Sequence, residues 1–308
     1  MIDESVMSFE EKAVFILRSL YMKYGYLPYK MSKFEEYELY IRNKDFLVSD
    51  RVIAFNDTNG KLMALKPDVT LSIIKSGEDV PGTKQKVCYN ENVYRVSEST
   101  HRFKEIMQTG LECIGDIDIN DVCEVICLAA ESLSKISDSF FLEISNMDII
   151  YSVISETCGD PEFMKKALLY ISQKNKHDLQ KLCSDYHIDP EDFEKISLLI
   201  TLYGSRNSVI DGLSKICDNE HIKNMAKLSS LLDASPFSDR ISFDFSIVND
   251  MNYYNGYVFK GFIEGISMGV LGGGQYDNMM KKMNRSSGAV GFALYLDRLE
   301  EINGEGKN

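Results

Sequence analysis

The sequence has 308 residues, of which 44% are hydrophobic and 26% charged, as expected for a water-soluble protein of one large domain or two ordinary ones. It has no apolar run long enough to span a membrane, and its acidic N-terminus lacks a signal-peptide core, so we expect a cytoplasmic protein without membrane contact. The formal net charge of −13 disfavours extended contact with nucleic acid, although a local basic patch would be compatible with it.

The first part of the chain predicts a helix followed by a small hairpin. Ser8 opens a capping box, and the apolar spacing behind it predicts a helix over residues 9–24 that stops at Gly25. Residues 45–65 predict two short strands around an Asn-Gly turn, and residues 68–75 predict the start of a second helix.

The next part alternates between strand and helix signals. Residues 86–95 and 103–114 predict two strands joined by a polar loop, and residues 120–135 carry the apolar stripe of a helix. A further strand is expected over residues 140–145.

A change of composition marks residues 148–232, which are rich in leucine, lysine and serine and have helical periodicity. We interpret this segment as a helical insertion. Residues 1–147 and 233–308 then form one core domain.

Strand signals return after the insertion. Residues 241–248 alternate, with Ile241, Phe243, Phe245 and Ile247 on one face, and strands are also expected at 256–265 and 266–273. Residues 276–283 predict a helix, and residues 288–302 a short strand entering the last helix. This order predicts an α+β fold with a largely antiparallel sheet flanked by helices.

Cysteine usage argues against disulfides and zinc. The chain has seven cysteines and four histidines without a Cys-x-x-Cys pair, and Cys123 and Cys127 lie four positions apart on a predicted helix. We expect buried thiols in a reducing compartment and no metal or other cofactor.

The glycine cluster "GVLGGGQYD" at 269–277 has two interpretations. Glycines between a strand and a helix can bring the backbone close to a phosphate, but the spacing matches neither common nucleotide-binding pattern. A tight turn that needs positive φ is favoured.

Two pairs of polar residues are candidates for a binding site. Gln108 and Glu112 lie four positions apart on a predicted strand, so both face one side and would suit a cationic or amphoteric ligand, unless that side is simply exposed to solvent. Asp68 and Thr70 follow a proline at a predicted helix start, where capping is the alternative.

Other candidates have equally plain alternatives. Tyr253 and Tyr254 could be ordinary sheet aromatics, Arg298 could form a surface ion pair, and His101 is interpreted as solvated. The sequence contains no hydrolase or metalloprotease signature and no Cys/His nucleophile pair.

Taken in order, these motifs resemble the catalytic core of histidyl-tRNA synthetase, a class II synthetase. The chain reads "LKPDVT", "VYR…RFKEIMQTGLECIG", "NDMNYYNGYVFKGF", "GGGQYD" and "GAVGFALYLDRLEEI". The family reads roughly R-P-E-x-T, F-R-x-E with Q-x-G-x-E, R-G-L-D-Y-Y, G-G-R-Y-D and V-G-F-A-x-G-x-E-R-L. The match runs from about residue 10 to residue 302, and the family fold is an antiparallel sheet flanked by helices with a helical insertion.

This resemblance implies a histidine pocket. In it, Asp68, Thr70 and Gln108 would accept hydrogen bonds from the α-ammonium group. Glu112 and Tyr254 would hold the two imidazole nitrogens beside Tyr253, with the glycine turn closing over the ligand. The positions that bind ATP in the family are occupied by Arg95 and Arg298.

The family's catalytic residues are less complete in this chain. Asn249 replaces the arginine of R-G-L-D-Y-Y, and Gln275 replaces that of G-G-R-Y-D. Ser97 falls at the glutamate of F-R-x-E, with Glu98 as a substitute. Because a neutral amide stabilises developing negative charge poorly, we expect no activation of histidine. The chain ends about ten residues after Arg298, so no anticodon-binding domain is expected.

A synthetase-like core with these departures is similar to the regulatory subunit of ATP phosphoribosyltransferase. That resemblance implies a non-catalytic chain that supports the first step of histidine biosynthesis and its feedback inhibition by L-histidine. Its partner would be a short catalytic subunit in a hetero-octamer built around synthetase-like dimers, without tRNA. Whether histidine occupies the synthetase-like pocket or a subunit interface stays open.

Two alternatives remain. One is a truncated synthetase-like enzyme that forms aminoacyl adenylate, motivated by Arg95 and Arg298. The other is a ligand-binding or scaffold protein outside histidine metabolism.

Overall fold

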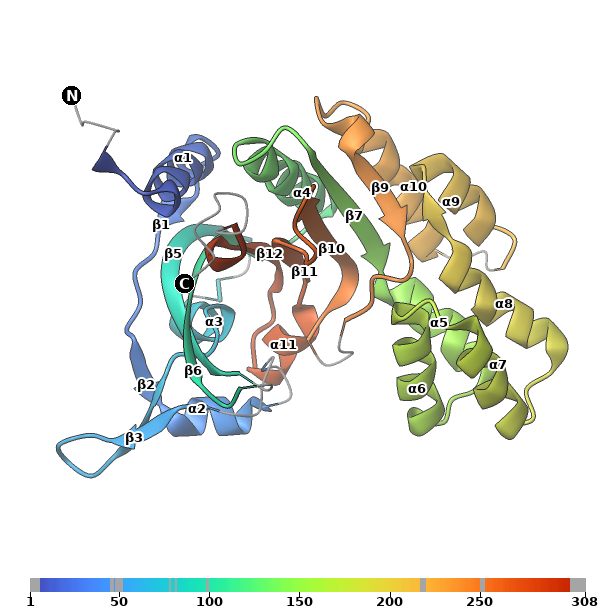
Figure 1. Ribbon diagram of the computed structural model, residues 1–308, viewed down its shortest axis with the longest axis horizontal. Coiled ribbons are helices and arrows are strands. Elements are labelled where there is room, and N and C mark those ends of the chain that lie inside the picture. The colour runs from blue at the N-terminus through green and yellow to red at the C-terminus, as the bar shows by residue number, and fades with distance from the viewer. Residues whose placement is uncertain are drawn as a thin grey trace.

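The fold is built around one large, strongly twisted sheet (Figure 1). The computed structural model describes residues 6–44, 47, 52–77, 79–80, 82–97, 100–216, 220–249 and 253–299. Within these residues the sheet has nine strands, in the spatial order β1 (Leu27–Pro28), β5 (Lys84–Val96), β6 (Phe103–Gly115), β12 (Gly288–Tyr295), β11 (Leu271–Gln275), β10 (Asn255–Ile263), β7 (Phe140–Asn146), β9 (Ile241–Asp244) and β8 (Tyr203–Gly204).

The sheet is antiparallel except at its flanks. Only the β1–β5 and β7–β9 pairs run parallel among the described strands. The long β5–β6 hairpin and the central β6, β12, β11 and β10 strands are all antiparallel. This arrangement confirms the predicted α+β fold with a largely antiparallel sheet.

Helices cover both faces of the sheet. On one face, α1 (Phe9–Lys23) and α4 (Ile119–Ser134) pack on a core that includes Leu111 and Cys113. On the other, α3 (Thr70–Ser76) and α11 (Asp277–Lys282) pack on a second core that includes Val87 and Tyr89 (Figure 1). One face of the sheet therefore packs against α1 and α4. On the other face, α3 and α11 pack against side chains of β5.

The helix starts follow the sequence signals closely. The Ser8 hydroxyl accepts from the Glu11 amide at 3.2 Å, and the Glu11 carboxylate accepts from the Ser8 amide at 2.8 Å. Asp118 caps α4 through the same reciprocal arrangement with Asp121. Both capping boxes satisfy backbone donors that a helix start leaves free.

A small second sheet lies beside the main one at a corner of the molecule (Figure 1). It contains β2 (Phe34–Glu36), β4 (Leu62–Leu65) and β3 (Ala54–Asn56), and α2 (Tyr37–Arg42) packs against it. The turn between β3 and β4 is held by the Asp57 carboxylate, which accepts from the amides of Asn59 and Lys61, both at 2.8 Å. The hairpin predicted within 45–65 is confirmed for its described residues.

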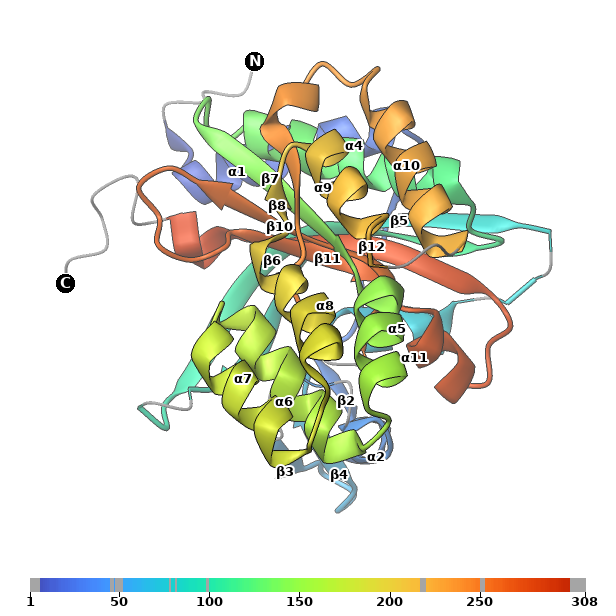
Figure 2. The ribbon, with the colours of Figure 1, turned by 90° about the vertical axis from the view of Figure 1, so that its right-hand side faces the viewer.

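Among the described residues, six α-helices lie between β7 and β9 in the sequence and occupy one side of the molecule (Figure 2). Their packing is continuous with the core under the sheet, and α4 contacts α10 directly. The short strand β8 interrupts the helices and joins the main sheet beside β9. The division into a core domain and an insertion at 148–232 stays a prediction. The six helices are α5 (Met147–Thr157), α6 (Pro161–Ser172), α7 (Lys176–Asp185), α8 (Pro190–Thr201), α9 (Arg206–Leu213) and α10 (Glu220–Leu232).

The strand predicted over 241–248 is too long. It ends at Asp244, whose buried carboxylate accepts from the amide and hydroxyl of Ser246 at 2.8 and 2.6 Å and from Lys174 at 2.9 Å. A short polar side chain that hydrogen-bonds two residues ahead stabilises a turn instead of a ladder. Alternation alone did not reveal this.

The C-terminal prediction also needs correction. The strand expected over 266–273 begins only at Leu271. The last helix is a single 3₁₀ turn at Leu296–Leu299 in the part of the chain that the structure describes, and residues 300–302 of the prediction lie outside it.

The glycine cluster is a strand, not a turn. Gly272, Gly273 and Gly274 lie inside β11, and none of them has positive φ. The reason for glycine is close packing, because a Cβ on Gly274 would lie 2.7 Å from the Tyr254 ring, and one on Gly291 of β12 would overlap the Glu112 carboxylate. The cluster therefore forms a flat floor and does not close over a ligand.

This packing predicts different outcomes for two glycine substitutions. Gly291→Ala should lower the free energy of unfolding by about 2 kcal/mol or more, because the added methyl displaces a buried carboxylate. Gly272→Ala, whose Cβ would lie 3.7 Å from the Tyr295 hydroxyl, should change it by less than about 1 kcal/mol. Urea unfolding measures both, and equal losses would contradict the packing argument.

Candidate functional site

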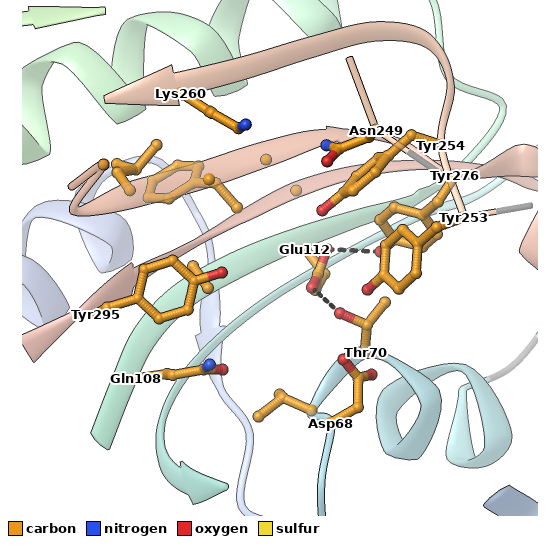
Figure 3. Close-up of a pocket in the computed structure, with 18 of the residues that line it drawn as sticks. Asp68, Thr70, Gln108, Glu112, Asn249, Tyr253, Tyr254, Lys260, Tyr276 and Tyr295 are labelled. Atoms are coloured by element: carbon orange, nitrogen blue, oxygen red, sulfur yellow. Dashed lines mark hydrogen bonds between the residues drawn. The ribbon is translucent and has the colours of Figure 1, made fainter. Parts of the chain in front are cut away.

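A cavity of about 560 Å³ opens above the glycine floor, on the face of the sheet that carries α3 (Figure 3). All eight site residues proposed from the sequence line it, although they come from five separate segments. That they share one cavity is a finding, and that they bind histidine or ATP stays a prediction. These residues are Asp68, Thr70, Arg95, Gln108, Glu112, Tyr253, Tyr254 and Arg298.

Glu112 is the centre of the cavity's hydrogen bonding. Its side chain is only 2% exposed. The Thr70 hydroxyl donates to one carboxylate oxygen at 2.9 Å, and the Tyr276 hydroxyl donates to the other at 2.6 Å (Figure 3). Each oxygen keeps a second lone pair, so the carboxylate can still accept from a bound N–H group.

Burial raises the pKa of Glu112 to about 8. The hydrogen bonds from Tyr276 and Thr70 lower this pKa, and the nearby Asp68 carboxyl raises it. Glu112 therefore exchanges its proton near neutral pH in the empty protein, where a cationic ligand would favour the charged form.

Asp68 combines a structural contact with a place in the cavity. Its carboxylate accepts from the Leu71 amide at 2.9 Å in the first turn of α3, which supports the capping interpretation. Burial raises its pKa, while the Leu71 amide and the Arg95 charge lower it. Asp68 and Glu112 together make one end of the cavity acidic.

Gln108 and Glu112 lie on the same side of β6, as their spacing predicts, and both are buried. The solvent-exposed alternative for this pair is therefore wrong. Tyr253 and Tyr254 pack with their ring centroids 4.4 Å apart, and Tyr253 lies 6.5 Å from Tyr276. Burial raises the pKa of all three hydroxyls well above the usual value, so they remain protonated donors at neutral pH.

Both arginines already make contacts within the protein. Arg95 donates to the Pro67 carbonyl at 3.0 Å. Arg298 lies over the Tyr295 ring, 4.1 Å from its centroid, and donates to the Gly269 carbonyl. The interpretation of Arg298 as a partner in a surface ion pair is not supported, because it lines the cavity instead.

The departures from the synthetase motifs fall in different places. Asn249 lines the cavity, so the motif arginine that it replaces is absent from the site itself. Gln275 is not among the described lining residues, and its side chain accepts from the Tyr257 amide at 3.0 Å within the sheet. Lys66 is buried in an ion pair with Glu91 at 2.8 Å. Glu98 lies outside the described residues.

Sequence reasoning missed several lining residues, among them three tyrosines and a lysine. Tyr89, Tyr276 and Tyr295 add aromatic walls and hydroxyl groups, and Lys260 adds a cation. Tyr276 stands in the quoted "GGGQYD" motif, and Tyr295 alternates with Gly291 and Ala293 on β12, so motif position and strand period could have indicated both.

The described part of the chain gives no support for a metal site or a membrane span. No group of three or more His, Cys, Asp or Glu side chains there could hold a metal ion. No helix in that part of the chain is both long and apolar enough to cross a bilayer. The described cysteines are free, with Cys88, Cys113 and Cys183 buried.

A largely antiparallel sheet with flanking helices and a polar cavity on one face is the arrangement of class II aminoacyl-tRNA synthetases. A family model described as histidyl-tRNA synthetase matches residues 4–299. The chain therefore belongs to the histidyl-tRNA synthetase family.

Relatives within this family have a more specific name. The chain is 28% identical over 290 residues to a protein of Oceanobacillus iheyensis named ATP phosphoribosyltransferase regulatory subunit, covering 92% of this chain and 71% of that protein.

Solved structures agree on the fold. A Bacillus halodurans structure titled ATP phosphoribosyltransferase regulatory subunit/histidyl-tRNA synthetase has a TM-score of 0.82 at 22% identity, covering 99% of this chain and 82% of that one. A Thermotoga maritima structure titled ATP phosphoribosyl transferase (HisG:HisZ) complex has a TM-score of 0.73 at 20% identity, covering 96% and 97%.

The raised pKa of Glu112 predicts a pH-dependent stability. Because the folded state holds this proton up to about pH 8 and the unfolded state releases it near the ordinary glutamate pKa of 4.5, stability should fall as pH rises through that window. Glu112→Gln removes the ionisation. As the pH rises from about 5 to about 9, the free energy of unfolding of the variant should therefore increase relative to that of the native protein by up to about 5 kcal/mol.

Denaturant unfolding across this pH range measures the gain. Glu264→Gln, at an exposed position in a turn away from the cavity, is the control and should follow the native protein. A constant difference between Glu112→Gln and the native protein at all pH values would contradict the assignment.

Proposed function

We propose that this chain is a non-catalytic regulatory subunit of an ATP phosphoribosyltransferase. In this role it supports the first step of histidine biosynthesis through a separate catalytic chain and binds L-histidine as the feedback signal. The observation that carries the proposal is the combination of a complete set of pocket residues with Asn249 in place of a cavity arginine.

The acidic end of the cavity suits the two basic groups of histidine. Glu112 can accept from an imidazole N–H, and the Tyr254 hydroxyl can pair with the other ring nitrogen. Asp68, Thr70 and Gln108 offer oxygens for the α-ammonium group. Buried carboxylates that are costly to ionise alone are stabilised by such a cation, which supports binding of a basic amino acid at this end.

The same cavity is poorly equipped for adenylation. Charge that develops on a reacting carboxylate and phosphate needs fixed cations or strong donors, and the neutral Asn249 amide supplies little of this stabilisation. Arg95 and Arg298 each already donate to a backbone carbonyl. Binding without chemistry is the function that these residues support.

The names of relatives support the choice of partner. Proteins that carry the regulatory-subunit name resemble this chain over nine-tenths of its length, and one solved neighbour is titled as a HisG:HisZ complex. The proposed assembly is a hetero-octamer of synthetase-like dimers with a short catalytic subunit, without tRNA. The free thiols agree with its placement in the cytoplasm.

Feedback inhibition requires that histidine distinguish two states of the complex. A ligand changes an equilibrium only by its difference in affinity for the two states. The cavity draws its walls from α3, from the sheet and from residues 253–254, so closure of these segments around histidine could favour the inhibited arrangement.

The first test is direct binding of L-histidine to the purified chain by calorimetry, alone and with the catalytic partner. Glu112→Ala should weaken binding at least about tenfold, since it removes a charge-assisted hydrogen bond. Glu264→Ala should bind like the native chain. Absence of binding in both settings would refute the histidine site.

The second test concerns the partner. The chain should co-purify with a short ATP phosphoribosyltransferase subunit, raise its turnover, and make it sensitive to L-histidine. A complex that forms without any gain in turnover would contradict the regulatory role.

The alternative is an enzyme that forms aminoacyl adenylate, and it is favoured by the presence of Arg95 and Arg298 in the cavity. It requires histidine-dependent exchange of pyrophosphate into ATP. We expect no exchange above background because Asn249 stands where the charge would be stabilised. Exchange that Arg298→Ala abolishes would establish the enzyme instead.

A further inference from the structure

The cavity has a cationic side opposite Glu112. On this side Lys260, unlike Arg298, donates no hydrogen bond to any residue that the structure describes. Lys260 projects from β10 into the cavity lining and is half-buried. Within the described part of the chain, no hydrogen bond or ion pair joins its amino group to another residue. Glu143 lies directly across on β7, yet the two side chains form no ion pair.

Its neighbours leave the Lys260 charge available. Arg298 is stacked on Tyr295 and bonded to the Gly269 carbonyl. Burial lowers the pKa of Lys260, the Arg298 charge lowers it further, and Glu143 raises it. An unpaired, partly desolvated ammonium group beside a second cation is stabilised by a bound anion.

The strand positions in register with Lys260 across the floor carry only glycine and alanine. The register places Lys260 beside Gly272, Gly272 beside Ala293, and Ala293 beside Gly110, whose strand also carries Glu112. Three strand spacings, about 14 Å between backbones, separate β10 from β6. The Glu112 carboxylate leans from β6 over Gly291 of β12, which shortens the distance to be bridged. A small ligand can lie across β12 and β11 with one end toward each charge.

Figure 3 shows the same arrangement. The Lys260 amino group extends toward the part of the cavity that holds Asn249 and Tyr254, and Glu112 lies beyond them with Thr70 and Tyr276. A ligand that bridges these sides must be cationic where it meets Glu112 and anionic where it meets Lys260. An α-amino acid with a basic side chain has this distribution of charge.

We propose that Lys260 binds the α-carboxylate of the amino-acid ligand and thereby selects the free amino acid over analogues without that group. This assignment rests on the proposed function, since it takes the histidine site as the ligand site. It makes Lys260 a specificity-determining residue, while Glu112 recognises the imidazole.

The test compares L-histidine with L-histidinol, which keeps the imidazole and the amine but has an alcohol in place of the carboxylate. Calorimetry of the native chain should give an affinity for histidine about tenfold or more above that for histidinol, the size of a charge-assisted hydrogen bond. Lys260→Met should lose about tenfold or more in histidine affinity and bind histidinol within about twofold of the native chain.

Two further variants serve as controls. Lys260→Arg should restore part of the histidine preference because it keeps the charge. Lys165→Met, at an exposed position on α6, removes a lysine far along the chain from the cavity lining and should leave both affinities unchanged.

The outcomes separate the assignment from the proposed function. If the native chain and Lys260→Met bind histidine equally well, the carboxylate assignment is wrong while the histidine site stands. A loss of ATP binding by Lys260→Met without a loss of histidine binding would also overturn it and assign the lysine to a nucleotide. If the native chain binds neither histidine nor histidinol, the proposed function is wrong, and the carboxylate assignment, which rests on it, is wrong as well.

Discussion

The burial of one carboxyl group, that of Glu112, determines the shape of the site. A buried carboxylate without partners is costly, so the chain must bring donors to it from elsewhere. Thr70 arrives on the first turn of α3 and Tyr276 at the start of α11, and both donate to Glu112 on β6. The opposite strand must in turn carry Gly291, because any side chain there would occupy the same space. These contacts tie together segments that are 42 and 164 residues apart in sequence.

The same burial opposes folding and favours binding. A carboxyl group whose pKa rises to about 8 lowers the stability of the empty protein at neutral pH and above. A cation placed against it recovers that free energy, so ligand binding and local stability are linked. In a regulatory protein this linkage is useful, because the state that closes around the ligand gains the most. Such a difference between two states is what an allosteric effector requires.

Local signals predicted the elements well and the close contacts poorly. The Ser8 capping box, the apolar stripe of α4 and the period of β6 act over a few residues, and each was confirmed. The Asp244 turn is held by contacts with Ser246, and its carboxylate also pairs with Lys174, 70 residues away. The glycine cluster packs closely against Tyr254, so an alternating pattern showed neither feature. The resemblance brought eight residues to one cavity, but it did not reveal Lys260, whose position becomes visible only in the strand order β6, β12, β11, β10.

The departures from the synthetase motifs do not all carry the same meaning. Gln275 bonds the backbone of β10 within the sheet, so the loss of an arginine at that position says little about charge in the cavity. Asn249 does line the cavity, yet Lys260 and Arg298 keep one side of it cationic. The cavity has therefore not simply lost its positive charge, because cations remain beside a floor that has room for a small amphoteric molecule. Cations placed to hold a ground-state carboxylate favour binding, whereas catalysis requires charge directed at groups that appear only in the transition state. The position of the remaining charges, more than their number, supports a protein that senses an amino acid.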